Sequence, residues 1–164
     1  MKTLIAVSAL LLSLPTLAET GAVVQAQLSP AGNFQAKTAQ VKGTATLKGD
    51  QVSAQKVVIP LSTLATGIEL RDKHMKDKYL EVGKFPDAEL IEATGKGGQG
   101  RGKLKIRGIE KEVTGTYQVI GGKELEAKFP IKLSDFKIDG IRYMGVGVKD
   151  EANVTVTLPL VPGK

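Results

Sequence analysis

Apolar and polar residues alternate along most of the chain with a period of two, which is typical of strands that bury one face. The clearest alternating run spans residues 123–133, and residues 154–160 repeat the pattern near the C-terminus. Further strands are expected at 22–28, 34–38, 41–47, 51–60, 87–94, 104–106 and 113–119. The pattern therefore predicts an all-β protein of about eight or nine short strands.

Glycine-rich turn signals separate these runs. They fall at 48–50, 95–102, 107–108 and 121–122, where hairpins between neighbouring strands are expected. Regular short strands at this spacing favour an antiparallel sandwich or barrel. An eight-stranded barrel is wide enough either to be filled by its own side chains or to hold one elongated ligand. The pattern leaves both possibilities open.

Pro130 and Pro159 interrupt two of the strongest strands. Both lie on the outward-facing parity, and a proline cannot donate a hydrogen bond to a neighbouring strand. We therefore expect bulges or unpaired edges at these two positions.

One segment, residues 62–87, does not alternate. Residues 69–80 can form about three helical turns with an apolar stripe, and Gly83 is expected to end the helix. Phe85-Pro86 then predicts an extended exit into the next strand. A short helix of this kind is expected to cap one end of the core, where a ligand tunnel would also open.

The N-terminus is predicted to be a signal peptide of residues 1–18. A basic start and an apolar run of about a dozen residues precede small residues that end at Ala18. The run is shorter than the roughly 20 residues of a spanning helix, so no stable membrane insertion is expected after cleavage. Residues 19–164 are predicted to form one domain that is periplasmic or secreted. It has no cysteine and, at this size, needs no disulfide.

The net charge of +6 leaves several partners open. Nucleic acid is not expected, because the chain is exported and has only three tyrosines, four phenylalanines and no tryptophan for stacking on bases. A lysine-rich solvated surface, an anionic membrane surface and an anionic ligand headgroup all remain compatible with the charge.

Catalytic and metal chemistry find little support in the residues. His74 is the only histidine, no cysteine is present, and no serine lies in a nucleophile elbow. One histidine cannot supply a usual zinc site. We predict no catalytic residues, no metal and no enzyme activity. A hydrolase remains the alternative that loss of an activity in His74→Ala would support.

Three groups of motifs carry a resemblance to a known family. The first group comprises Thr66-Gly67-Ile68, residues 71–75, Tyr79-Leu80 and residues 85–88. The second group is residues 102–111. The third group comprises residues 135–136, 144–146 and 148–150. In order and spacing they resemble the YceI family of lipid- or polyisoprenoid-binding, lipocalin-like exported proteins. Members usually carry histidines in their first strands, and residues 22–38 have none.

The resemblance implies an extended eight-stranded antiparallel lipocalin-like barrel around an apolar tunnel, with the helical insertion capping one end. It implies an amphiphilic ligand such as a polyprenyl phosphate, a quinone tail or a similar lipid, and often a homodimer. No cofactor is required, although an isoprenoid or quinone-like lipid can be bound.

The leading hypothesis is thus an exported carrier or buffer of an isoprenoid-like amphiphile. The predicted tunnel lining is Leu104, Ile106, Val113, Tyr117, Val119, Leu125, Ala127, Phe129, Ile131, Val154, Val156 and Leu158. The predicted headgroup contacts are Arg71, His74 and Lys103. The alternative is a periplasmic interaction module with a filled core that docks to a membrane or redox partner. A continuous apolar cavity would favour the carrier.

Overall fold

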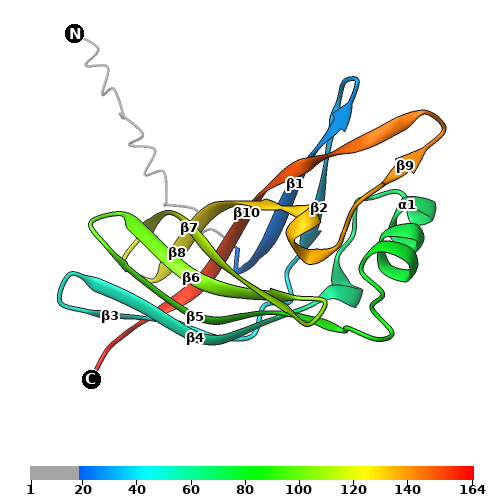
Figure 1. Cartoon of the computed structure of the whole chain (residues 1–164). Coiled ribbons are helices and arrows are strands. Elements are labelled where there is room, and N and C mark those ends of the chain that lie inside the picture. Colours follow the sequence, from blue (N-terminus) through cyan, green and yellow to red (C-terminus); the bar gives the residue numbers. More distant parts are fainter. Residues whose placement is uncertain (1–18) are drawn as a thin grey trace, which may run out of the picture.

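The computed structural model of the protein describes residues 19–164, so the predicted signal peptide at residues 1–18 lies outside the described part. The described residues form one sheet and three short helical segments (Figure 1). The strands are β1 (Gly21–Ser29), β2 (Asn33–Thr38), β3 (Ala45–Lys48), β4 (Gln51–Pro60), β5 (Asp87–Lys96), β6 (Gln99–Ile106), β7 (Ile109–Ile120), β8 (Glu124–Lys132), β9 (Arg142–Tyr143) and β10 (Val146–Pro162). The helical segments are η1 (Leu61–Thr63), α1 (Glu69–His74) continued by η2 (Met75–Tyr79), and η3 (Leu133–Phe136).

The sheet closes into a barrel through β10. One edge of β10 pairs with β8 and the other with β3, so that β10, β3, β4, β5, β6, β7 and β8 form a ring. The predicted class, an all-β barrel with a short helical insertion, is confirmed. Two details differ from the expectation: seven strands close rather than eight, and the β10–β3 pairing is parallel.

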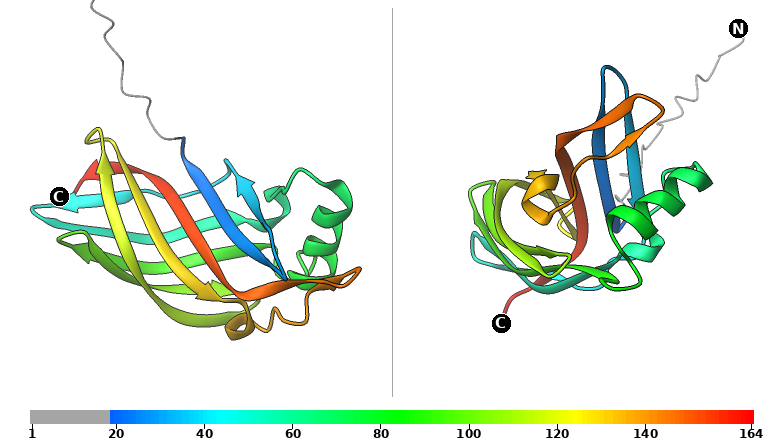
Figure 2. Two further views of the ribbon diagram at one scale, coloured as in Figure 1. Left: turned by 90° about the horizontal axis from the view of Figure 1, so that it is seen from above. Right: turned by 45° about the vertical axis from the view of Figure 1, so that its right-hand side comes forward.

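Both differences follow from the length of β10, which has 17 residues. Along one edge, its residues 147–157 pair with β1, and its residues 160–162 then pair with β3. The β1–β2 hairpin therefore extends the wall beyond the closed ring, beside the hairpin that joins β9 to β10 (Figure 2). An isolated bridge joins Lys37 of β2 to Ala65, and another joins Lys42, in the β2–β3 connection, to Val58 of β4.

The two prolines lie where a strand lacks one neighbour. Pro130 pairs with Asn153 of β10, but the pairing of β8 with β7 stops at Lys128. Pro159 pairs with Glu124 of β8 and lies between the end of the β1 pairing and the start of the β3 pairing. The expectation of unpaired edges at both prolines is confirmed.

The inward face of β4 changes parity halfway along the strand. Val52 and Ala54 are buried before the change, and Val57 and Ile59 after it. Lys56, with a φ of 53°, lies between the two pairs. The neighbouring β5 has a matching irregularity, because its register with β6 shifts between Leu90 and Glu92. The barrel wall thus bends at this level, and both halves of β4 still bury apolar side chains.

Segment η3 fills a gap in the barrel wall. Only residues 116–120 of β7 pair with β8, and η3 contacts β7, β8 and β10 beside the part left open. Phe136 of η3 is 1% exposed and is among the most deeply buried large side chains. The carboxylate of Asp150 on β10 accepts hydrogen bonds of 2.7 Å from the amide and the hydroxyl of Ser134. These bonds fix η3 against β10.

The helix predicted over residues 69–80 is present over residues 69–79. After α1 it widens into a π-turn, in which the amide of Leu80 donates to the carbonyl of Met75 at 2.8 Å. The chain leaves the helix through Glu81, whose φ is 49°. Gly83 was the expected end, and that expectation was wrong. A non-glycine residue can take the left-handed conformation here because its side chain is held by Arg107.

Candidate functional site

A cavity of about 460 Å³, here called the main cavity, runs through the wide end of the barrel. The side chains around it come from β1, β2, β4, β5, β6, β8 and β10, from the α1–η2 helix and from the segment after η3. All are apolar or aromatic except Arg71, His74 and Arg142. Protein interiors contain few voids larger than a water molecule, so a cavity of this size is not a packing defect. The structure does not support the alternative of a filled core.

The exposed residues of the main cavity lie on two segments. Its exposed lining residues, here called the mouth, are Ile68, Leu70, His74, Arg142, Met144 and Val146. Deeper lining residues are almost completely covered, with Val57 at 0% and Ala152 at 1% exposure. The mouth is therefore formed by the α1 segment on one side and the β9–β10 hairpin on the other.

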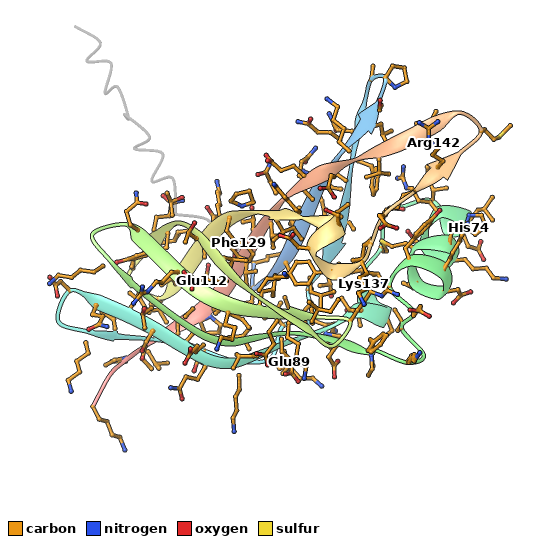
Figure 3. The ribbon with its side chains drawn as sticks, in the orientation of Figure 1. His74, Glu89, Glu112, Phe129, Lys137 and Arg142 are labelled. Carbon is orange, nitrogen blue, oxygen red and sulfur yellow. The ribbon has the colours of Figure 1, made fainter. Side chains whose placement is uncertain are left out.

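The polar groups of the cavity gather at this mouth. His74 lies on α1 and Arg142 on β9, at the same end of the molecule, whereas Phe129 lies well inside the barrel (Figure 3). Arg71 lines the cavity one helical turn before Met75. The arrangement is that of a site for an amphiphile, in which an apolar interior excludes water and polar groups meet a head at the entrance.

Thr66 holds Arg71 in place. The Nε of Arg71 donates to the Thr66 hydroxyl at 2.8 Å, and its Nη2 donates to the Thr66 carbonyl at 3.1 Å. The guanidinium lies 4.4 Å from the centroid of the Phe34 ring on β2, within cation–π range. These contacts tie the helix to the β1–β2 hairpin across the cavity.

Asp72 completes the anchoring of this loop. Its carboxylate accepts hydrogen bonds from both the amide and the hydroxyl of Thr66. Partial burial works to raise the pKa of Asp72. The bonds from Thr66, together with the positive charges of Lys76 and Arg71, outweigh it and leave that pKa below its ordinary value. Asp72 therefore stays ionised at neutral pH and serves to position the helix.

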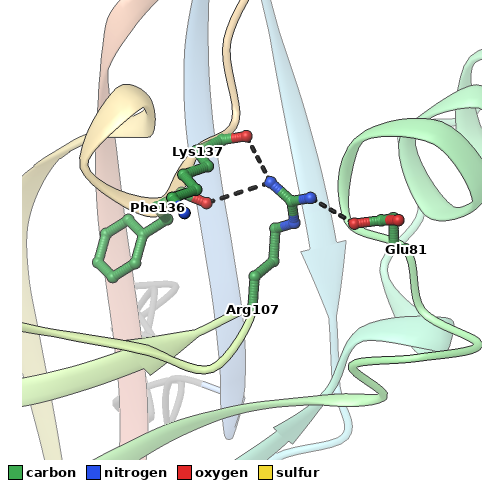
Figure 4. Close-up of polar contacts among 4 residues, drawn as sticks. All are labelled: Glu81, Arg107, Phe136 and Lys137. Carbon is green, nitrogen blue, oxygen red and sulfur yellow. Dashed lines mark hydrogen bonds and ion pairs between the residues drawn. The ribbon is translucent and has the colours of Figure 1, made fainter.

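Arg107 joins three segments beneath the helix (Figure 4). Its guanidinium donates to the carboxylate of Glu81, to the carbonyl of Lys137 and, at 3.3 Å, to the carbonyl of Phe136. The turn at Arg107-Gly108, predicted from the sequence, places both residues at positive φ, as a tight two-residue hairpin turn requires. The turn thus aims Arg107 at both the helical cap and η3.

A second, smaller cavity of about 80 Å³, here called the inner cavity, lies toward the end of the barrel opposite the helical cap. Leu90, Phe129 and Val156 line both cavities and so stand between them. Beyond them the Tyr117 ring lies against Gly95. A Cβ atom on Gly95 would lie 2.5 Å from that ring, which explains why glycine occupies this strand position. Residues 95–102, expected to form a loop, are mostly strand around a tight turn at Gly97-Gly98.

The predicted tunnel residues divide between the two cavities. The main cavity is lined by Leu104, Ile106, Phe129, Ile131, Val154 and Val156. The inner cavity is lined by Val113, Tyr117, Leu125, Ala127 and Leu158, together with Phe129 and Val156. Val119 lines neither cavity and is 42% exposed.

The predicted headgroup residues also separate. Arg71 and His74 both line the main cavity at the mouth end. Lys103 does not line it: it lies on β6 with its Nζ 4.0 Å from the Glu92 carboxylate, on the outer face of the wall. Sequence order places Lys103 next to the lining residue Leu104, but successive side chains of a strand point to opposite faces.

Several lining residues were not predicted. Ala22, Val24, Ala26 and Leu28 line the main cavity along β1, and their spacing of two was a signal that could have identified them. Arg142 and Met144 also line it, from a short hairpin that shows no such pattern. Only the fold brings this hairpin opposite the helix.

Among residues 19–164, no three His, Cys, Asp or Glu side chains are grouped so that they could hold a metal ion. Within the same residues, no helix combines the length and the hydropathy needed to cross a membrane.

Comparison with known families and structures places this geometry among related proteins. Residues 16–160 match the model of the YceI-like domain. A polyisoprenoid-binding domain from Saccharophagus degradans, implicated in plant cell wall breakdown, has a TM-score of 0.59 at 12% identity, over 84% of this chain and 91% of that one. A Campylobacter jejuni YceI protein has a TM-score of 0.54 at 19% identity, over 78% and 85%. A mutant YceI protein with a monobromobimane guest has a TM-score of 0.57 at 19% identity, over 78% and 84%. No curated protein matches the chain.

Proposed function

The chain belongs to the family of YceI-like domains, and on that premise we propose that it is an exported carrier or buffer of an isoprenoid-like amphiphile. The tail of a polyprenyl phosphate, a quinone or a similar lipid lies in the main cavity. The observation that carries the proposal is a cavity of about 460 Å³ whose interior is apolar and whose charged groups lie at the entrance. The polyisoprenoid-binding domain from Saccharophagus degradans, which has the same fold, further supports this class of ligand.

The energetics suit a long apolar tail. Burying a methylene group contributes about 0.8 kcal/mol, so roughly ten of them supply about 8 kcal/mol before the costs of association. Micromolar binding corresponds to a net binding free energy of about that size. A tail longer than roughly ten methylenes therefore leaves room for the costs of association. Because each further methylene changes the affinity little, discrimination among apolar tails should be weak.

The headgroup lies at the mouth in this proposal. Arg71 is preorganised there by Thr66 and Phe34, and Arg142 approaches from the opposite side. An arginine binds phosphate oxygens through paired N–H donors, which suits a polyprenyl phosphate. His74 adds a further polar group on the same helix. The chain supplies binding and solvent exclusion, and the proposal includes no chemical step.

Native mass spectrometry of protein purified without detergent tests the proposal. We expect a bound lipid, or uptake of geranylgeranyl phosphate or a short-tailed quinone in a ratio of one to one. Consistent absence of lipid together with no uptake of either probe would overturn it. Export is tested separately by the mass of the mature chain, which we expect to begin at Glu19.

A further inference from the structure

Exposed apolar side chains concentrate at the mouth of the main cavity. Six large hydrophobic residues are exposed in the described part of the chain, and four of them belong to the mouth. Ile68 and Leu70 are 53% and 50% exposed at the start of the helix, and Met144 and Val146 are 85% and 40% exposed on the β9–β10 hairpin. The apolar lining of the cavity thus continues outward onto the rim instead of ending at it.

Met144 is the most exposed of these residues and stands at the tip of the hairpin. It occupies the first central position of the two-residue turn between Tyr143 and Val146, with a φ of 48°. Such turns favour Asn, Asp or Gly, because the left-handed conformation is costly for other residues. Neither the turn nor solvation by water favours a long apolar side chain here, so its presence points to an apolar environment outside the protein.

The segments that form the apolar rim also carry cations. Lys73, Lys76 and Lys78 follow Arg71 on the helical segment, and Arg142 precedes the hairpin tip. The helical segment also carries Glu69, Asp72 and Asp77, so cations exceed carboxylates there by one, and Arg142 on the hairpin adds a further cation. None of the ion pairs found within residues 19–164 involves these four lysine and arginine side chains or Arg71. Apolar tips with cations nearby are complementary to an anionic bilayer surface.

We propose that the mouth docks onto an anionic lipid bilayer, with Met144, Ile68 and Leu70 entering the acyl boundary and the surrounding cations contacting the phosphates. The proposal rests on the proposed function, because it assumes that the protein binds an isoprenoid-like lipid. It adds that this lipid is exchanged with a bilayer surface. A tail can then pass from the bilayer into the main cavity without crossing water. Docking also explains why the polar contacts of the cavity are confined to the entrance.

Vesicle sedimentation tests the proposal with the mature protein. We expect binding to vesicles of phosphatidylglycerol and phosphatidylcholine in equal parts, much weaker binding to phosphatidylcholine alone, and loss of binding at high salt. Met144→Glu and Leu70→Glu should each lower the apparent affinity about tenfold, because a charge must then enter the acyl boundary.

Val161→Glu is the matched control. Val161 is 39% exposed on β10, lines neither cavity and lies outside the mouth, so this variant should bind vesicles as the wild type does. Circular dichroism checks that all three variants are folded. No vesicle binding by the wild type, or equal losses in the Val161 and Met144 variants, would overturn the proposal. A third outcome would also overturn it: a wild-type protein that is dimeric and does not bind vesicles, with Met144→Glu monomeric. The rim would then be covered by a second copy of the chain.

The two proposals fail in different ways. Uptake of geranylgeranyl phosphate by the wild type in lipid-free solution, measured beside vesicle binding, separates them. Uptake without vesicle binding would overturn docking and leave the carrier function standing. Vesicle binding without uptake would support docking and overturn the carrier.

Discussion

The guanidinium of Arg107 donates a hydrogen bond to the carboxylate of Glu81 and so joins the β6–β7 turn to the end of the helical cap. Glu81, Arg107 and Lys137, whose carbonyl also accepts from Arg107, all have left-handed backbones, with φ of 49°, 53° and 56°. Such conformations are costly for non-glycine residues and persist when surrounding contacts hold them. The contact therefore fixes the cap and η3 relative to the barrel beneath the main cavity.

Stability should depend on pH through Glu81. The hydrogen bond from Arg107 and the nearby charges of Arg107 and Lys84, opposed by desolvation, hold the pKa of Glu81 below its ordinary value of 4.5. Since the folded pKa is the lower one, the pair stabilises the fold fully above the unfolded pKa and loses its effect as pH falls through the folded pKa. Thermal melts should thus show a stability gap between wild type and Glu81→Gln at neutral pH that narrows below about pH 4.5.

Arg107→Ala is the companion to this test. It should lower the melting temperature more than Glu81→Gln does, because it also removes the donors to Phe136 and Lys137. A gap between wild type and Glu81→Gln that stays constant with pH would show that the pair does not carry the effect.

Filling the main cavity should block uptake of an amphiphile. Ala152 lines the main cavity at 1% exposure, between Ala26 of β1 and Ile131 of β8. Ala152→Phe places a ring in that space and should reduce affinity at least about tenfold, with little loss of stability because the cavity leaves room for it.

Ala127→Phe is the matched control for Ala152→Phe. Ala127 was predicted from the sequence as a tunnel residue, but it lines the inner cavity and not the main one. A short tail should therefore bind this variant as it binds the wild type. Titration of both variants with geranylgeranyl phosphate checks the pair. Equal losses in the two variants would mean that the ligand reaches past Phe129.

Arg142 should favour a phosphate head over a neutral one. Its side chain lines the mouth, and charge-assisted hydrogen bonds to phosphate are stronger than neutral ones. Arg142→Ala should weaken binding of geranylgeranyl phosphate about tenfold, or ~1.4 kcal/mol, and change the affinity for geranylgeraniol little. Calorimetry with both ligands measures the difference. A similar loss for phosphate and alcohol would assign Arg142 to packing alone.

Gly95 should be required by the Tyr117 ring. A Cβ atom at position 95 would meet that ring at 2.5 Å and the Val52 side chain at 3.0 Å. Gly95→Ala should destabilise the fold by about 1–3 kcal/mol through overpacking. Tyr117→Leu should restore part of the loss when combined with Gly95→Ala, because it removes the ring atoms in conflict. Denaturant unfolding of the two single variants and the double variant measures the coupling, and additive losses would contradict the close contact.

The alternation of apolar and polar residues predicted the strands correctly where the barrel wall has no bulge or bend. On β8 and in residues 152–160 of β10 most alternate residues are buried, as in Leu125, Phe129 and Val154, and the predicted strands 123–133 and 154–160 fall there. On β4 the parity changes at Lys56, so no single alternating pattern joins Val52 to Ile59. A bend of this kind depends on strain between paired strands and leaves little trace in local sequence.

The residue pattern by itself determined an all-β protein, a sandwich or a barrel, with one helical insertion, because a period of two and glycine turns are local properties of the chain; the choice of a barrel came from the family resemblance. Tertiary structure decided that β10 pairs with β1 and then with β3, which widens one end of the barrel into a cavity. It also decided that the hairpin carrying Arg142 and Met144 meets the helix carrying Arg71 at one mouth. Such juxtapositions arise from long-range strand pairing, whose partners are distant along the chain and cannot be found from the local pattern of side chains.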